Sequence, residues 1–241
     1  MSLPTTLLKR TPLPPLRPSL PKRQTRYSLI SSSPPLPRSD IRICFLGDSF
    51  TTGAGDDTLL GFPGRLCSAL RTNHNLDITS YNLGIRRDTS ADILARWERE
   101  VAARLEPSQG YEGRLVFCFG TNDNVFENGE RRVRTQTTLV NAKDMLMKAK
   151  QKWPTVMLGP PWTSVGDVDE GNRVLSRELE GLCGEIGVPF LSLYERLEGN
   201  GVWAREAEAG DGIHPGAGGY GLIAEAVEGW EGWEGFVREG K

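Results

Sequence analysis

The chain has 241 residues, of which 29 are basic and 31 acidic, and its 38% of hydrophobic residues is an ordinary share for a globular domain. The first 39 residues hold seven of the basic residues and none of the acidic ones, so the rest of the chain is acidic, which argues against nucleic acid as a partner. No apolar run approaches the ~20 residues that a membrane span requires, so we expect no span.

Residues 1–39 contain nine of the sixteen prolines and almost no periodic apolar pattern. Such a segment cannot build a core, and we expect a disordered or polyproline-like tail followed by one domain over residues 40–241. A basic, acid-free composition is also typical of organelle transit peptides, although the prolines interrupt the amphipathic helix that such a peptide needs. We therefore expect a cytoplasmic protein, with organelle targeting by the tail as the alternative.

From residue 41 onward, segments typical of strands and helices alternate. The expected strands cover residues 41–46, 78–83, 115–119, 155–159 and 188–193, and the expected helices cover residues 62–70, 88–105, about 130–152, about 172–186 and a stretch after residue 215. The strands are short apolar runs, as in sheets that are buried on both faces. The sequence thus predicts one α/β domain with a five-stranded parallel sheet between two layers of helices.

Cysteine and aromatic residues read as parts of the core. The four cysteines show no C-x-x-C spacing, which disfavours a metal site or a redox pair and indicates buried thiols in a reducing compartment. Trp230, Trp233 and Phe236 lie at helical spacing and are expected to dock on their own domain. Trp162 follows the fourth strand and is expected either in the core or beside a bound acyl chain.

Three polar positions follow predicted strand ends: Ser49, Gly84 and Asn122. The carboxyl ends of parallel strands meet at one edge of a sheet, where ligands bind in open α/β folds. The N–H groups of Ser49 and Gly84 and the amide of Asn122 would be three donors for an oxyanion. The alternative is that Gly84 only ends a strand and that Asn122 closes an Asx-turn.

The chain has two histidines, His74 and His214. His74 lies in a polar turn and reads as a surface residue. His214 follows Asp211 by three residues, a spacing that lets a carboxylate orient an imidazole that serves as a general base. The alternative is that Asp211 caps the final helix and that His214 is an ordinary loop residue.

These motifs together are similar to the four sequence blocks of the GDSL, or SGNH, hydrolase family, in the same order over residues 41–228: Gly47-Asp48-Ser49-Phe50, Asn82-Leu83-Gly84, Gly120-Thr121-Asn122-Asp123 and Asp211-x-x-His214. The resemblance implies a flavodoxin-like three-layer α/β/α fold and hydrolysis of a small-molecule acyl ester or thioester without a cofactor or metal. It implies Ser49 as nucleophile, His214 as base, Asp211 as its partner, and an oxyanion hole from Ser49, Gly84 and Asn122. Phe50 replaces the leucine of the family name.

The loop after Gly84 departs from the family pattern, because Arg86 and Arg87 stand where many members have small residues. Their guanidinium groups are suited to an anionic substrate group or to surface carboxylates such as Asp88. The sequence leaves both possibilities open.

Two other functions compete with the serine hydrolase. Residues 49–53 resemble the phosphate loop of a flavodoxin-like electron carrier that binds flavin mononucleotide, but that reading gives Asn122 and the Asp211/His214 pair no role. A catalytically silent binding module of the same fold is the other alternative. The α/β-hydrolase signature G-x-S-x-G is absent.

Overall fold

The computed structural model describes residues 40–74, 76–106 and 110–238, so the predicted tail over residues 1–39 lies outside the described part. Five strands form an all-parallel sheet in the order β2-β1-β3-β6-β7. They are β1 (Asp40–Gly47), β2 (Asp77–Gly84), β3 (Glu112–Cys118), β6 (Thr155–Leu158) and β7 (Phe190–Leu191). This flavodoxin-like order reverses direction at β1, which places the topological switch point between β1 and β3.

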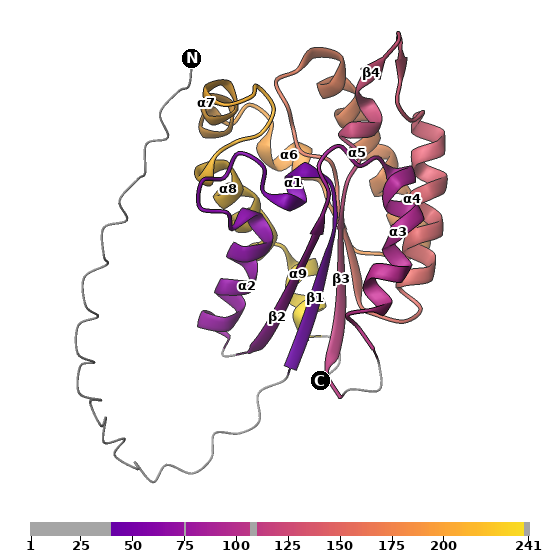
Figure 1. Cartoon of the computed structure of the whole chain (residues 1–241), viewed down its shortest axis with the longest axis vertical. Coiled ribbons are helices and arrows are strands. Elements are labelled where there is room, and N and C mark those ends of the chain that lie inside the picture. Colours follow the sequence, from indigo (N-terminus) through magenta and orange to yellow (C-terminus); the bar gives the residue numbers. More distant parts are fainter. Residues whose placement is uncertain (1–39, 75, 107–109, 239–241) are drawn as a thin grey trace, which may run out of the picture. The chain divides into compact units, whose positions relative to one another are not determined.

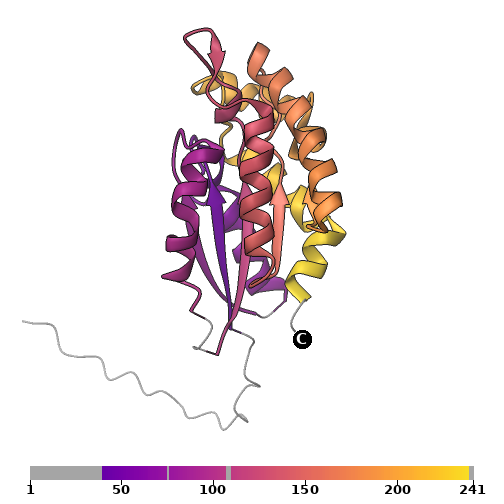
Figure 2. The same cartoon turned by 90° about the vertical axis from the view of Figure 1, so that its right-hand side faces the viewer.

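Helices cover both faces of the sheet, as predicted (Figures 1 and 2). One face carries α2 (Gly61–Asn73), α8 (Ala217–Glu228) and α9 (Glu231–Arg238), and the other carries α3 (Ser90–Ala102), α4 (Thr135–Ala149) and α5 (Gly166–Ile186). Successive strand residues point into opposite cores: Phe45 packs in the α2/α8 core and Leu46 in the α3/α4/α5 core, both fully buried. The three-layer α/β/α fold is thereby confirmed.

The structure differs from the sequence-based expectation around residue 130. A hairpin of β4 (Phe126–Glu127) and β5 (Glu130–Arg131) precedes α4, which begins at Thr135 rather than near residue 130. Asn128 and Gly129 turn the hairpin with positive φ angles of 55° and 83°. An Asn-Gly pair favours this kind of two-residue turn, so the signal was present in the sequence. Figure 2 shows the hairpin projecting at the end of the sheet where the strand arrows terminate.

Other boundaries also differ from the expected ones, above all around the fifth strand and at the start of α5. Strand β7 has only two residues, and the chain then forms α6 (Leu193–Leu197) and α7 (Gly201–Ala209), neither of which was predicted. Helix α5 begins at Gly166, earlier than the predicted start near residue 172. Leucines on both sides of Ser192 made the strand look longer than it is. In the structure the strand ends at Leu191, and the Ser192 hydroxyl caps α6 by accepting a hydrogen bond from the N–H of Glu195.

The aromatic residues Trp233 and Phe236 and the cysteines lie in the core, as expected. Trp233 and Phe236 are buried and stack with ring centroids 5.1 Å apart. All four cysteines are buried, and Trp162 is half-buried against the α2/α8 core. Within the described residues, every helix is too short or too polar to cross a membrane.

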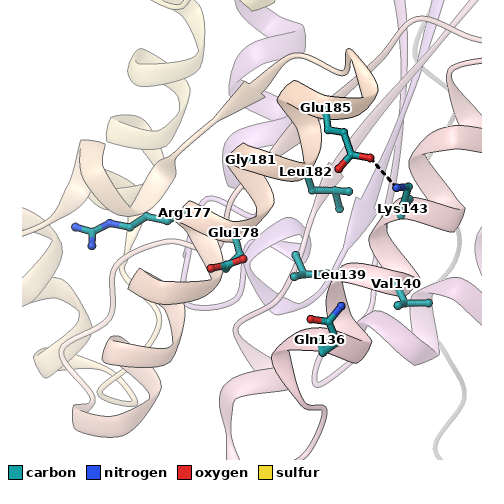
Figure 3. A pocket seen from close by; sticks show the side chains of 9 residues that line it. All are labelled: Gln136, Leu139, Val140, Lys143, Arg177, Glu178, Gly181, Leu182 and Glu185. Carbon is teal, nitrogen blue, oxygen red and sulfur yellow. Dashed lines mark hydrogen bonds and ion pairs between the residues drawn. The ribbon is translucent and has the colours of Figure 1, made fainter.

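A shallow groove of about 490 Å³ lies between α4 and α5 (Figure 3). Lys143 and Glu185 form an ion pair of 2.9 Å across it, and Leu139, Val140 and Leu182 supply its apolar part. The predicted site residues are not among those that line it.

Candidate active site

Ser49 lies directly beyond the end of β1, in the first turn of the short helix α1 (Ser49–Thr52). Asp48 is the N-cap of this helix, and its Oδ1 accepts a hydrogen bond of 2.9 Å from the N–H of Phe50. Gly53 ends the helix with a φ of 84°, a conformation that glycine adopts without strain. The sharp turn from strand to helix holds the Ser49 side chain in a nearly buried position, 5% exposed.

Three predicted residues from opposite ends of the domain meet in one chain of polar contacts. The Oγ of Ser49 lies 2.7 Å from Nε2 of His214, and Nδ1 of the same ring lies 2.7 Å from Oδ2 of Asp211. The other oxygen of Asp211, Oδ1, accepts from the backbone N–H groups of Ile213 and His214, at 3.0 and 2.9 Å. The imidazole is therefore held between a hydroxyl and a fixed carboxylate.

The charge state of Asp211 follows from these contacts. Burial alone would raise the pKa of this carboxyl, but hydrogen bonds from the backbone and ring of His214 and from the N–H of Ile213 lower the pKa to about 2. Asp211 is thus a carboxylate at neutral pH, as a group that orients an imidazole must be.

The segment that carries His214 is fixed by the loop that follows α1. The hydroxyl of Tyr220 donates 2.7 Å to the carbonyl of Ala54, and a Cβ on Gly55 would lie only 2.6 Å from the carbonyl of Pro215. Arg65 joins the two segments, because it donates to Asp56 and, at 3.1 Å, to the carbonyl of Ala217. These contacts were not anticipated, since they depend on side chains far apart in the sequence.

The three predicted oxyanion donors differ in their availability. In the described part of the chain, no hydrogen bond uses the N–H of Ser49. The Nδ2 of Asn122 donates 3.1 Å to the carbonyl of Asp88, and the same side chain lies close enough to Asp48 to favour the charged form of that carboxyl. The N–H of Gly84, in contrast, donates 3.0 Å to Oδ1 of Asn82.

Gly84 also has a packing role. A Cβ at this position would lie 2.4 Å from the N of Thr52 and 2.8 Å from the O of Asp48. The absence of a side chain lets the end of β2 lie directly against α1. This close approach explains the glycine independently of any role as a donor.

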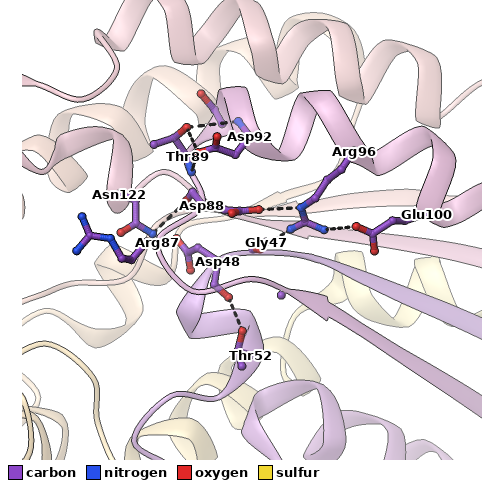
Figure 4. A network of polar contacts seen from close by, with 12 residues as sticks. Gly47, Asp48, Thr52, Arg87, Asp88, Thr89, Asp92, Arg96, Glu100 and Asn122 are labelled. Atoms are coloured by element: carbon purple, nitrogen blue, oxygen red, sulfur yellow. Dashed lines mark hydrogen bonds and ion pairs between the residues drawn. The ribbon is translucent and has the colours of Figure 1, made fainter.

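A half-buried arginine, Arg96 of α3, organises the loop between β2 and α3 (Figure 4). Its Nε lies 2.7 Å from Oδ2 of Asp88, and its Nη2 donates 3.0 Å to the carbonyl of Gly47 at the end of β1. Because Asp88 in turn accepts from Asn122, Arg96 ties three strand-end segments together. The sequence indicated only a helical position for Arg96.

The two loop arginines do not pair with Asp88, whose carboxylate contacts Arg96 instead. Arg87 donates 3.1 Å to Oε1 of Glu127 on the β4–β5 hairpin. The Nη2 of Arg86 lies 3.9 Å from Oδ2 of Asp211. The alternative of pairing with surface carboxylates is therefore met by Arg87 through Glu127 and not through Asp88, the example that the sequence suggested.

Two buried carboxyls lie beneath the strand ends. Burial raises the pKa of Asp48 to about 7, against the opposing effect of the N–H of Phe50. Burial also raises the pKa of Asp123, which accepts hydrogen bonds from Ser90 and Thr138. Among the described residues, no group of three or more His, Cys, Asp and Glu side chains is arranged to hold a metal ion.

A protein family described as the GDSL-like lipase/acylhydrolase family matches residues 45–222 of this chain. Among curated proteins, no match to this chain was found. The matched range includes Ser49, Asp211 and His214.

Several solved structures with the same fold are 18–21% identical to this chain. An acetylxylan esterase from Geobacillus stearothermophilus has a TM-score of 0.64 at 19% identity, over 81% of this chain and 97% of its own. A lipase/acylhydrolase from Enterococcus faecalis has a TM-score of 0.63 at 20% identity, over 82% and 96%. A member of the lipolytic G-D-S-L family from Veillonella parvula has a TM-score of 0.62 at 18% identity, over 83% and 100%.

Proposed function

Because this chain belongs to the GDSL-like lipase/acylhydrolase family, we propose that it cleaves esters or thioesters through an acyl-enzyme formed on Ser49. Membership of the family makes the chain a carboxylic ester hydrolase. The observation that carries the proposed mechanism is the pair of 2.7 Å contacts that link Ser49, His214 and Asp211. A catalytically silent module has no need for a hydroxyl, an imidazole and a carboxylate at these distances.

The proposed reaction begins with attack of the Ser49 Oγ on the acyl carbonyl carbon. Nε2 of His214 takes the hydroxyl proton as the C–O bond forms, and the ionised Asp211 stabilises the imidazolium through Nδ1. The imidazolium then gives its proton to the leaving alcohol or thiol, which departs and leaves the acyl group on Ser49. A water molecule activated by His214 attacks the acyl-enzyme and releases the acid.

The developing oxyanion needs donors that are already in place. We propose the N–H of Ser49 and the side-chain amide of Asn122, because the contact with the carbonyl of Asp88 holds this amide in place. The N–H of Gly84 serves as a third donor only if it exchanges Asn82 Oδ1 for the oxyanion. Asn82→Ala would free this N–H and so tests whether the exchange limits turnover.

For the substrate and the cellular compartment we propose classes rather than a single molecule or location. The acetylxylan esterase among the structural neighbours makes acetylated saccharides one class to test beside simple acyl esters and thioesters. The four buried cysteines fit a reducing compartment such as the cytoplasm.

The test combines a chain-length series of 4-nitrophenyl acyl esters with variants of the three residues. We expect Ser49→Ala and His214→Ala to abolish burst and steady-state turnover, and Asp211→Asn to lower kcat by about 100-fold or more, because the imidazole loses its orienting carboxylate. A fluorophosphonate probe should add its mass to Ser49 in the wild type. Ser68→Ala, an exposed serine on α2, is the matched control and should behave as wild type.

Full activity in Ser49→Ala, or labelling at another residue, would contradict the proposal.

A further inference from the structure

Arg86 lies at the exposed edge of the proposed active site. Its Nη2 is 3.9 Å from Oδ2 of Asp211, the oxygen that also contacts the ring of His214. Its side chain is 60% exposed and that of Asp211 is 49% exposed. A chain of contacts through Asp211 and His214 therefore links this guanidinium to the Ser49 hydroxyl.

The neighbouring arginines are already held by protein groups. Arg87 pairs with Glu127, Arg131 donates 2.7 Å to Oδ1 of Asn124, and Arg132 donates 2.8 Å to the carbonyl of Arg87. Arg86 forms an ion pair with Asp211, but at 3.9 Å this contact is longer than a hydrogen bond, and no hydrogen bond joins Arg86 to another described residue. Its five N–H donors remain available to a ligand.

The local charge also favours an anion. The loop after β2 and the β4–β5 hairpin with the residues that follow it contribute five arginines and three acidic residues: Arg86, Arg87, Arg131, Arg132, Arg134, Asp88, Glu127 and Glu130. The chain beyond residue 39 is acidic as a whole. A basic region beside the reacting serine on an otherwise acidic domain attracts anionic substrates and disfavours them elsewhere.

We propose that Arg86 binds an anionic oxyacid group of the substrate, so that the enzyme prefers esters that carry a negative charge near the scissile bond. The planar fork of a guanidinium matches the two oxygens of a carboxylate or phosphate. The exposure of Arg86 makes this contact sensitive to salt, because exposed charge pairs are screened. This proposal rests on the proposed function of Ser49 as nucleophile.

The test compares esters that differ only in charge. One pair is 4-nitrophenyl hydrogen succinate and its neutral methyl ester, with the charge on the acyl half, and the other is 4-acetoxybenzoate and its methyl ester, with the charge on the alcohol half. Arg86→Gln should lower kcat/KM for the charged member of at least one pair by about five- to tenfold and change the neutral members by less than about twofold. Arg86→Lys should restore part of the loss, and added salt should reduce the wild-type preference.

Arg87→Gln is the matched control. It removes the same charge from the next residue, whose side chain already pairs with Glu127. An equal loss in Arg87→Gln would mean that the general field, and not Arg86, selects the anion, which would overturn the proposal. Equal losses on charged and neutral esters in Arg86→Gln would also overturn it, because Arg86 would then act only through Asp211.

The two proposals fail in different ways. If the wild type hydrolyses neutral esters through Ser49 but Arg86→Gln leaves the ratio of charged to neutral rates unchanged, the role of Arg86 is refuted and the hydrolase stands. If the wild type is no faster than Ser49→Ala on every ester, the proposed function is refuted and the role of Arg86 with it.

Discussion

Asp48 places a buried carboxyl one residue before the proposed nucleophile. It is 1% exposed, and its Oδ2 has no hydrogen-bond partner within the part of the chain that the structure describes. Burial raises its pKa from 3.8 to about 7, although the N–H of Phe50 favours the charged form. Below this pH the group beneath Ser49 is neutral, which limits the negative charge near the developing oxyanion.

The raised pKa of Asp48 predicts a specific dependence of stability on pH. The folded protein keeps this proton after the unfolded chain has lost it, so the contribution is complete below the unfolded pKa of 3.8 and is lost as the pH rises through about 7. Between about pH 4 and 7 the free energy of unfolding of the wild type should fall with rising pH by up to about 1.4 kcal/mol per pH unit because of this group. Asp48→Asn removes the titrating group, so its free energy of unfolding should lack this fall.

Urea unfolding across this range measures the difference. Asp57→Asn, which changes an exposed carboxyl in the next loop, should run parallel to the wild type. Parallel curves for Asp48→Asn as well would contradict the raised pKa.

At the scale of elements, α7 and α8 are joined by one carboxylate. Helix α8 starts directly after the His214 segment, and its N-cap, Gly216, offers no side chain. Glu206 of α7 supplies the missing acceptor, because its two oxygens accept from the N–H groups of Gly218 and Gly219 at 3.1 and 2.7 Å. A carboxylate at a helix N-terminus also interacts favourably with the helix dipole.

Glu206→Ala should therefore destabilise the protein by about 1 kcal/mol, the usual cost of a lost helix cap. Glu208→Ala removes an exposed glutamate from the same helix and should change the free energy of unfolding by less than about 0.5 kcal/mol. Denaturant titration of both variants measures the difference, and equal effects would show that Glu206 acts only through net charge.

A substitution at Gly84 tests the close packing between β2 and α1, with Gly181 of α5 as the control position. Gly84→Ala would push a methyl group against the backbone of Thr52 and Asp48, so we expect a loss of about 1–3 kcal/mol together with a loss of turnover. Gly181→Ala, in α5, meets nothing within 4 Å and should raise stability by about 0.5–1 kcal/mol with unchanged turnover. Thermal unfolding and ester hydrolysis check both, and a harmless Gly84→Ala would contradict the close approach.

For the whole domain, the parallel sheet couples two cores. Met157 and Leu158 are neighbours on β6, both fully buried, and they face opposite sides of the sheet. Met157→Ala and Leu158→Ala should each cost about 2–5 kcal/mol, and each should leave a single unfolding transition in which circular dichroism and tryptophan fluorescence coincide. Separate transitions for the two signals would show that the cores unfold independently.

The sequence predicted the order of the elements, because short apolar runs that stop at glycines mark buried parallel strands. It also predicted that Ser49 and His214 meet, because Ser49 follows such a run and His214 lies in a loop three residues after Asp211. It did not predict that the N–H of Gly84 donates to Oδ1 of Asn82, because this contact depends on the conformation of the Asn82 side chain. The hairpin was missed because the helical pattern over residues 130–152 obscured the Asn128-Gly129 turn. The contact of Arg86 with Asp211 joins distant loops, and local patterns carry no information about it.

Ser49 and His214 stand 165 residues apart in the chain and yet share a hydrogen bond. During refolding, hydrolytic activity should therefore return last, after helical content has recovered, since contacts between distant residues close late. Turnover thus reports complete assembly of the domain more strictly than spectroscopic probes do.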